Sequence, residues 1–198
     1  ILLCVFSPLI VVIALAVKLI DPRGKIFFVQ NREGIDGAEF PIFKFRTMYS
    51  DADQRLVDHL IQNPHLRAEW EDTFQLANDP RVLPVVGNLL RKTSFDELPN
   101  LINVLRGELS LVGPRPCPKY HLDSFDHQFR QLRASVRPGL TCWWQIYRGD
   151  LNAQRYWDEH YIKNWSLLSD IWIFLRTVPV VITARHPIFS SAPQRDEH

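Results

Sequence analysis

The sequence predicts an α+β fold that is mostly helical, built around a small core. Three observations support this prediction: an uncharged apolar run over residues 1–17, one pair of β-rich runs between residues 26 and 48, and helix-favouring composition over most of the remainder. The chain has 198 residues, of which 46% are hydrophobic and 23% charged, so it can bury a core of its own. It contains no internal repeat and no linker that would divide it into separate globular domains.

The N-terminal run predicts a membrane-associated helix. As a helix, residues 1–17 would extend about 25 Å, slightly less than a ~30 Å hydrocarbon core. Pro8 breaks one helical hydrogen bond, and Ser7 can cover the carbonyl group that this frees. No small-residue cleavage pattern follows, which argues against a signal peptide. A spanning helix and a re-entrant helix fit about equally well, and in both the following basic residues belong on the cytoplasmic side: Lys18, Arg23 and Lys25. Because the chain starts inside this run without a Met, we expect further residues upstream.

A β-hairpin is expected next, over residues 26–48. Its strands are the β-rich runs 27–30 and 40–45, which are separated by the turn-forming sequence Glu-Gly-Ile-Asp-Gly. Helices are then predicted at 50–76, with an interruption at 63–64, within 77–90, at 121–135 and at 152–182. Pro138 and Gly139 occupy the central positions of a predicted type II turn.

The last predicted helix is rich in tryptophan. Trp157, Trp165 and Trp172 suit a core and a membrane interface about equally. The tail over 185–198 has no periodicity and is predicted to be mobile.

Residues 91–116, RKTSFDELPNLINVLRGELSLVGPRP, carry most of the chemical information. Asp96 and Glu97 stand at the start of a predicted helix with Leu98, Leu101, Ile102 and Leu105 as its apolar stripe and Gly107 as its C-terminal cap. Arg91 precedes the carboxylates and Arg115 follows them in a Gly-Pro-Arg-Pro loop. Carboxylates near guanidinium groups suit a magnesium-dependent reaction on a phosphate.

A simpler interpretation of the same residues is structural. An isolated Ser-x-x-Glu usually marks a helix start, in which Ser94 or Asp96 caps the helix and Glu97 complements the helix dipole.

Composition argues against other classes of protein. A net charge of +1, without any zinc-finger, RNP or basic-region pattern, gives no sign of a nucleic-acid partner. Three cysteines without paired spacing predict a reduced, cytosol-facing chain.

Several motifs in the same order resemble the bacterial polyprenol-phosphate phosphoglycosyl transferases of the monotopic kind. The resemblance covers roughly residues 5 to 183. The matching pieces are Asp96-Glu97-Leu98-Pro99, residues 111–116, Phe27-Phe28-x-Gln30-x-Arg32-x-Gly34, Lys44-Phe45-Arg46-Thr47-Met48, Asp79-Pro80-Arg81, Arg137-Pro138-Gly139-Leu140-Thr141 and Tyr161-x-x-Asn164-Trp165-Ser166.

The resemblance implies an enzyme that moves a sugar-1-phosphate from a UDP-sugar to polyprenyl (undecaprenyl) phosphate. Asp96 would attack the β-phosphorus and release UMP, and the lipid phosphate would then attack the sugar-phosphoryl aspartate. Mg²⁺ would be held by Glu97 and Asp96. The residues expected to bind substrate phosphates are Arg91, Arg115 and Arg137, with Lys44, Arg46 and Arg81 as further candidates.

The resemblance also implies a topology. Ser7 and Pro8 would break a re-entrant helix over residues 1–20, and residues 21–184 would form a catalytic domain with interfacial amphipathic helices. This domain would lie on the cytoplasmic face of the bacterial inner membrane.

The sequence departs from the family pattern at 142–145, where it reads Cys-Trp-Trp-Gln in place of Gly-Trp-Ala-Gln. This departure leaves the identity of the donor sugar undetermined. The oligomeric state also stays open, a homodimer included.

Two other classes compete with this hypothesis. A hydrolase acting on nucleotide sugars or lipid diphosphates would release sugar phosphate without a lipid acceptor. A non-catalytic membrane-anchored scaffold would not need Asp96 or Arg115, and both residues are present.

Overall fold

The computed structural model describes residues 2–67, 70, 76, 78–147 and 151–183, and within them the chain is mostly helical, as predicted. The tail predicted to be mobile, residues 185–198, lies outside the described residues. The elements are α1 Leu2–Ile20, β1 Phe27–Glu33, the 3₁₀ turn η1 Ile35–Gly37, β2 Glu39–Phe45, α2 Ala52–Gln62, α4 Val86–Thr93, the 3₁₀ turn η2 Phe95–Asn100, α5 Leu101–Leu105, β3 Ser110–Val112, α6 Lys119–Leu122, α7 His127–Ala134, β4 Gly139–Thr141, α8 Trp143–Tyr147, α9 Leu151–Lys163 and α10 Leu167–Thr183.

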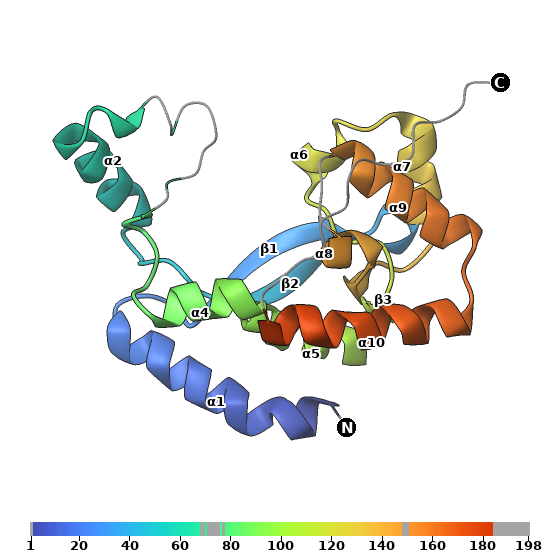
Figure 1. Cartoon of the computed structure of the whole chain (residues 1–198), viewed down its shortest axis with the longest axis horizontal. Coiled ribbons are helices and arrows are strands. Elements are labelled where there is room, and N and C mark those ends of the chain that lie inside the picture. The colour runs from blue at the N-terminus through green and yellow to red at the C-terminus, as the bar shows by residue number, and fades with distance from the viewer. Residues whose placement is uncertain (1, 68–69, 71–75, 77, 148–150, 184–198) are drawn as a thin grey trace.

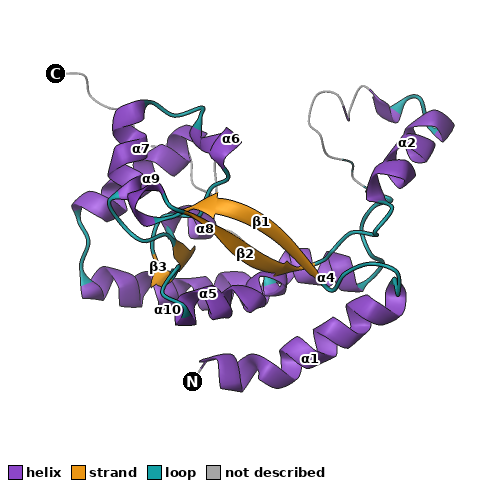
Figure 2. Ribbon diagram, turned by 180° about the vertical axis from the view of Figure 1, so that it is seen from behind, coloured by secondary structure: helices purple, strands orange, loops and turns teal. Residues whose placement is uncertain are grey.

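A long β-hairpin crosses the middle of the molecule (Figure 1). Its strands β1 and β2 are antiparallel, with Phe27 opposite Phe45 and Glu33 opposite Glu39, which confirms the predicted hairpin and extends its first strand. Helices α1, α4, α5 and α10 run along one side of the hairpin, whereas α6, α7 and α9 gather at the end where β1 finishes (Figures 1 and 2). The short strands β3 and β4 form a separate parallel pair.

Helix α1 continues through Pro8, and Ser7 compensates for the missing hydrogen bond. A proline at position 8 cannot donate to the carbonyl of Cys4, and Ser7 Oγ donates to that carbonyl at 2.8 Å. The helix is long and apolar enough to cross a membrane by length and composition. It buries Ile13 and Val17 in the core, and Leu9, Ile10, Ala14 and Ile20 pack half-buried against the same cluster. The large apolar side chains that it exposes are Val5, Val11, Val12, Leu15 and Leu19.

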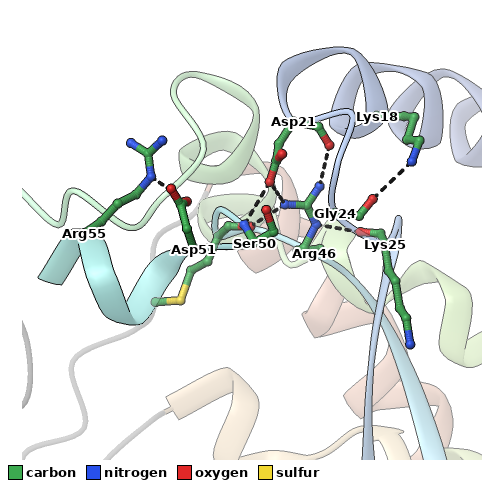
Figure 3. Close-up of polar contacts among 9 residues, drawn as sticks. Lys18, Asp21, Gly24, Lys25, Arg46, Ser50, Asp51 and Arg55 are labelled. Carbon is green, nitrogen blue, oxygen red and sulfur yellow. Dashed lines mark hydrogen bonds and ion pairs between the residues drawn. The ribbon is translucent and has the colours of Figure 1, made fainter.

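A polar network fastens the end of α1 to the end of β2 (Figure 3). Arg46 donates to the Asp21 carboxylate at 2.5 Å, to the Asp21 carbonyl at 3.0 Å and to the Lys25 carbonyl at 2.5 Å. The backbone N–H of Ser50 donates to the same carboxylate at 2.8 Å. Burial opposes ionisation of Asp21, but the hydrogen bonds from Ser50 and Arg46 outweigh it and hold the pKa of this carboxyl well below its usual range.

Three helix and turn predictions need correction. The predicted helix 121–135 is two helices, because Asp126 accepts from the backbone N–H of Phe129 at 3.0 Å and starts α7 afresh. The predicted helix 152–182 is interrupted between α9 and α10. The type II turn at Pro138 is wrong, since Gly139 does not have the positive φ that such a turn requires. A Cβ at Gly139 would lie 2.1 Å from the nitrogen of Gly113, so glycine is needed there for close approach of β3 and β4.

The tryptophans divide between the core and the surface. Trp157 is 8% exposed and stacks with Trp143, with ring centroids 5.3 Å apart, and with Tyr147 at 5.0 Å. Trp165 is 59% exposed. The aromatic stack therefore joins α8 to α9. Of the two alternatives left open, the core one holds for Trp157, whereas Trp165 and Trp172, the latter 36% exposed, are not core residues.

Candidate active site

Glu97 lies in a cleft where three segments converge on its carboxylate. Lys44 Nζ of β2 lies 2.6 Å from Oε1, and Arg115 Nη2 lies 3.5 Å from the same oxygen. Gln145 of α8 donates from Nε2 to Oε2 at 3.3 Å. The remaining residues that line the cleft are Arg32, Ile42, Asn100, Leu109, Pro116, Gly139 and Leu140.

Two buried asparagines fasten the carboxylate-bearing segment to the hairpin. Asn100, at the end of η2, accepts from the backbone N–H of Phe43 at 2.9 Å. Asn103 of α5 donates to the carbonyl of Pro41 at 2.7 Å. Both side chains contact backbone groups of β2, so the hairpin sets the position of the two carboxylates.

The local backbone differs from the predicted helix. Asp96 lies inside the 3₁₀ turn η2 rather than at a helix start, and Ser94 adopts a left-handed φ of 56° without a capping side-chain bond, so the capping box is wrong. The apolar stripe is only partly buried: Leu101 is 5% exposed but Leu105 is 70% exposed. The 3₁₀ turn changes the angular spacing that an unbroken helix would give these side chains. Gly107, with a φ of 75°, follows α5 where the predicted cap stands.

Asp96 is half-buried beside Glu97. Burial, followed by the charge of Glu97, raises the pKa of Asp96 to about 6, against the opposing influence of Lys44 and Arg115. A carboxylate with a raised pKa and cations nearby is typical of functional sites. Its burial leaves it less well solvated than a surface carboxylate.

The loop that carries Arg115 is held by a buried ion pair. Arg133 of α7 contacts Asp158 of α9, with side chains only 7% and 2% exposed. Arg133 Nη2 also donates to the carbonyl of Arg115 at 2.5 Å and lies 3.4 Å from Cys117 Sγ. Gln154 donates to the same sulfur at 3.1 Å. The helices α7 and α9 therefore position a backbone group of the loop next to the cleft.

The other four predicted phosphate-binding residues do not line the cleft. Arg91 lies at the end of α4 and donates to Thr47 Oγ1 at 3.0 Å. Arg137 is exposed, just before strand β4. Arg46 is engaged in the network at the end of α1, and Arg81 is paired with the carboxylate of its near neighbour Asp79 at 2.6 Å. Of the six basic candidates, Lys44 and Arg115 line the cleft.

Three polar residues of the cleft were not predicted from the sequence: Arg32, Asn100 and Gln145. Arg32 and Gln145 stand within motifs that already attracted attention, Gln-x-Arg and Cys-Trp-Trp-Gln, so their position in a motif was the available signal. Asn100 follows the Asp-Glu-Leu-Pro sequence directly, but a side chain that binds a strand 57 residues away leaves no local pattern.

A magnesium site could draw on Asp96 and Glu97. Within the part of the chain that the structure describes, no three His, Cys, Asp or Glu side chains are grouped as a metal site. Two adjacent carboxylates still fit Mg²⁺, which proteins often hold through one or two carboxylates together with water and substrate phosphates. Lys44 and Arg115 already share one oxygen of Glu97, so a metal there would share the carboxylate with them.

Carboxylates among cations, carried by a mostly helical domain with an apolar N-terminal helix, fit the class of membrane-associated enzymes that act on phosphates. The chain belongs to the bacterial sugar transferase family, whose model matches residues 1–184. The exopolysaccharide production protein ExoY of Sinorhizobium fredii (strain NBRC 101917 / NGR234) is 44% identical over 186 residues, which cover 92% of this chain and 81% of that protein.

Longer relatives share the same region. The undecaprenyl-phosphate galactose phosphotransferase of Salmonella typhimurium is 42% identical over 185 residues, covering 91% of this chain and 38% of that protein. The UDP-glucose:undecaprenyl-phosphate glucose-1-phosphate transferase of Escherichia coli (strain K12) is 40% identical over 191 residues, covering 89% and 37%. The chain thus spans most of ExoY but little more than a third of these two transferases.

Proposed function

We propose that the protein is a membrane-bound phosphoglycosyl transferase that moves a sugar-1-phosphate from a UDP-sugar to polyprenyl phosphate, undecaprenyl phosphate in particular. The reaction would initiate the assembly of an exopolysaccharide, capsule, O-antigen or related glycan. The names of the relatives support the substrates and the reaction. The observation that carries the proposal is the half-buried Asp96, beside Glu97 and close to the charges of Lys44 and Arg115.

The proposed chemistry has two displacements at the β-phosphorus. Asp96 attacks this phosphorus, the bond to the bridging oxygen breaks, and UMP leaves with the electron pair. The lipid phosphate then attacks the sugar-phosphoryl aspartate, which regenerates the carboxylate and gives polyprenyl-diphospho-sugar. Arg115 and Lys44 would neutralise phosphate oxygens during both steps.

Mg²⁺ belongs to the proposal as a cofactor, with Asp96 and Glu97 as the residues that would hold it. When bound, it supplies neutralisation of the negative charge on the diphosphate. A carboxylate is a weak nucleophile toward an anionic substrate, so charge neutralisation and alignment are the main contributions required of the site.

The proposed location is the cytoplasmic face of the bacterial inner membrane. Helices α1, α5 and α10 lie on the same side of the hairpin (Figures 1 and 2). Helix α1 exposes a row of apolar side chains, and large apolar groups are also exposed on α5 and α10. The exposed groups of these two helices include Ile102, Leu105, Leu168, Ile171, Leu175 and Val178. Such surfaces fit helices that lie in the membrane interface. The re-entrant path of α1 is part of this proposal.

The test uses Asp96→Asn with a matched control, Asp53→Asn, which makes the same change on the exposed face of α2. With a panel of UDP-sugars, Mg²⁺ and polyprenyl phosphate, Asp96→Asn should release no UMP, and the control should match the parent. Intact-protein mass spectrometry should find the sugar-phosphoryl adduct only when Asp96 is present. Near-normal UMP release by Asp96→Asn, checked for deamidation, would contradict the assignment.

The same assay separates the transferase from a hydrolase. A transferase forms lipid-linked product in step with continuing UMP release, whereas a hydrolase turns over fully without the lipid. Glu97→Gln should lower turnover by orders of magnitude and weaken its Mg²⁺ dependence, because an anionic ligand is lost from a hard cation. An unchanged Mg²⁺ titration would exclude Glu97 as a ligand.

A further inference from the structure

Arg32 is a cation in the cleft to which neither the motifs nor the relatives' names give a role. It lies on β1, and the strand register places it on the same face of the hairpin as Ile42 and Lys44, which also line the cleft. Its guanidinium donates to Gln30 Oε1 at 2.6 Å and to the carbonyl of Pro116 at 3.4 Å. Both acceptors are neutral, and the Nε atom is buried without a partner.

The charges around Arg32 favour an anionic ligand. Among the residues that the structure describes, Arg32 forms no ion pair, whereas Lys44 and Arg115 share the carboxylate of Glu97. Burial and, next, the positive charge of Arg115 lower the pKa of Arg32. Three cations, Arg32, Lys44 and Arg115, line the cleft against one lining carboxylate, that of Glu97, so a ligand that supplies negative charge is favoured there.

The position of Arg32 along the hairpin indicates which anion it serves. Lys44 pairs with Phe28, four residues before Arg32 on β1, or about 13 Å along the strand. Phe45, beside Lys44, packs in the cluster that contains Ile13 of α1, so this end of the cleft lies towards the membrane helix. Arg32 lies near the other end of the strand, one residue before Glu33, which pairs with Arg130 of α7 at 3.3 Å.

We propose that Arg32 binds the phosphate of the departing nucleotide, the group that remains in UMP. This inference rests on the proposed function, because it assigns the leaving-group side of the first displacement. Attacking and leaving oxygens lie roughly in line on opposite sides of the phosphorus, so the leaving group points away from Asp96. Arg32 lies away from the Lys44 end of the cleft, on the side that the nucleotide phosphate occupies first, and the lipid phosphate attacks from this same side after UMP has left. There the guanidinium neutralises the charge that develops on the bridging oxygen.

A purely structural role for Arg32 would make different predictions. Its bond to Pro116 helps to hold the loop that carries Arg115, so a variant that loosens the loop would weaken every ligand of the cleft. A phosphate-binding role weakens ligands that carry a phosphate and spares uridine. Comparison of uridine with UMP separates these cases, because the two ligands differ only in that phosphate.

The experiment measures binding of UMP and uridine to the full chain in the Asp96→Asn background, where no turnover occurs. Arg32→Gln should weaken UMP binding roughly 10- to 100-fold, the range for losing a charge-assisted hydrogen bond, and leave uridine binding within about twofold. Arg32→Lys, which retains the charge without the planar fork, should lie between parent and Arg32→Gln. Arg67→Gln, at an exposed position outside the cleft, is the matched control and should bind UMP as the parent does.

Three results would overturn the inference: unchanged UMP binding by Arg32→Gln, equal losses for UMP and uridine, or a larger loss for a short-chain polyprenyl phosphate than for UMP. If Arg32→Gln does not fold, as judged by thermal unfolding, the comparison of UMP with uridine in Arg32→Lys decides. A parent protein that binds neither UMP nor UDP would count against the proposed function instead.

Discussion

Removal of one partner from the buried Arg133–Asp158 pair should destabilise the protein far more than removal of both. Asp158→Leu leaves the guanidinium of Arg133 buried without its carboxylate, and uncompensated charges of this kind cost about 3–5 kcal/mol. In a chain of this size each kcal/mol corresponds to about 2–4 °C in Tm, so the apparent Tm should fall by roughly 6–20 °C. The double variant Arg133→Met/Asp158→Leu removes both charges and should stay near the parent Tm.

Activity should respond differently from stability. In the double variant the carbonyl of Arg115 loses the hydrogen bond that Arg133 donates at 2.5 Å. The loop that presents the Arg115 guanidinium to Glu97 is then less well positioned, and small displacements of catalytic groups can cost about 10²-fold in rate. We therefore expect turnover to fall roughly 10- to 100-fold in a protein of nearly unchanged stability.

Thermal unfolding in nanodiscs and UMP release with saturating substrates measure the two effects. Lys163→Met is the control: it breaks the exposed pair with Glu159 at 3.3 Å, which should contribute at most about 1 kcal/mol. The reasoning is refuted if Asp158→Leu is no less stable than the control. It is also refuted, on the side of function, if the double variant keeps full turnover.

Three further predictions concern the metal, the α1 anchor and the topology. Mg²⁺ affinity, measured by calorimetry, should rise as the pH rises through about 6, because Asp96 must lose its proton to bind the cation; an affinity independent of pH between 5 and 7 would contradict this. Gly24→Ala should lower the Tm, since its Cβ would lie 2.4 Å from Cζ of Arg46, whose guanidinium is fixed by several hydrogen bonds; an unchanged Tm would show that Arg46 moves freely. Cysteines placed upstream of residue 1 and just after Asp21 should both be labelled from the cytoplasmic side. Pro8→Ala should move the upstream site across the bilayer and lower activity, because it removes a helix-breaking effect of about 3 kcal/mol. Labelling of the two sites from opposite faces in the unmutated protein would establish a spanning helix.

Local patterns predicted the features that depend on neighbours in the sequence. The apolar run with Ser7 and Pro8 predicted a helix in which the Ser7 hydroxyl donates to the carbonyl that the proline leaves without a donor, that of Cys4. Alternating β-rich runs around a Gly-containing turn gave the hairpin. The helix prediction over 121–135 failed because the cap of α7 at Asp126 restarts the helix, a choice between two local signals.

The sequence by itself determined the apolar N-terminal helix, the hairpin and the adjacent carboxylates Asp96 and Glu97, because each follows from periodicity or from residues a few positions apart. Only the tertiary structure decided which cations serve the cleft. Arg46 and Arg115 were both candidates from the sequence, but the first pairs with Asp21, 25 residues away, and the second with Glu97. A cation's role depends on which groups lie within a few ångströms in space, and this distance is set by how the helices pack on the hairpin.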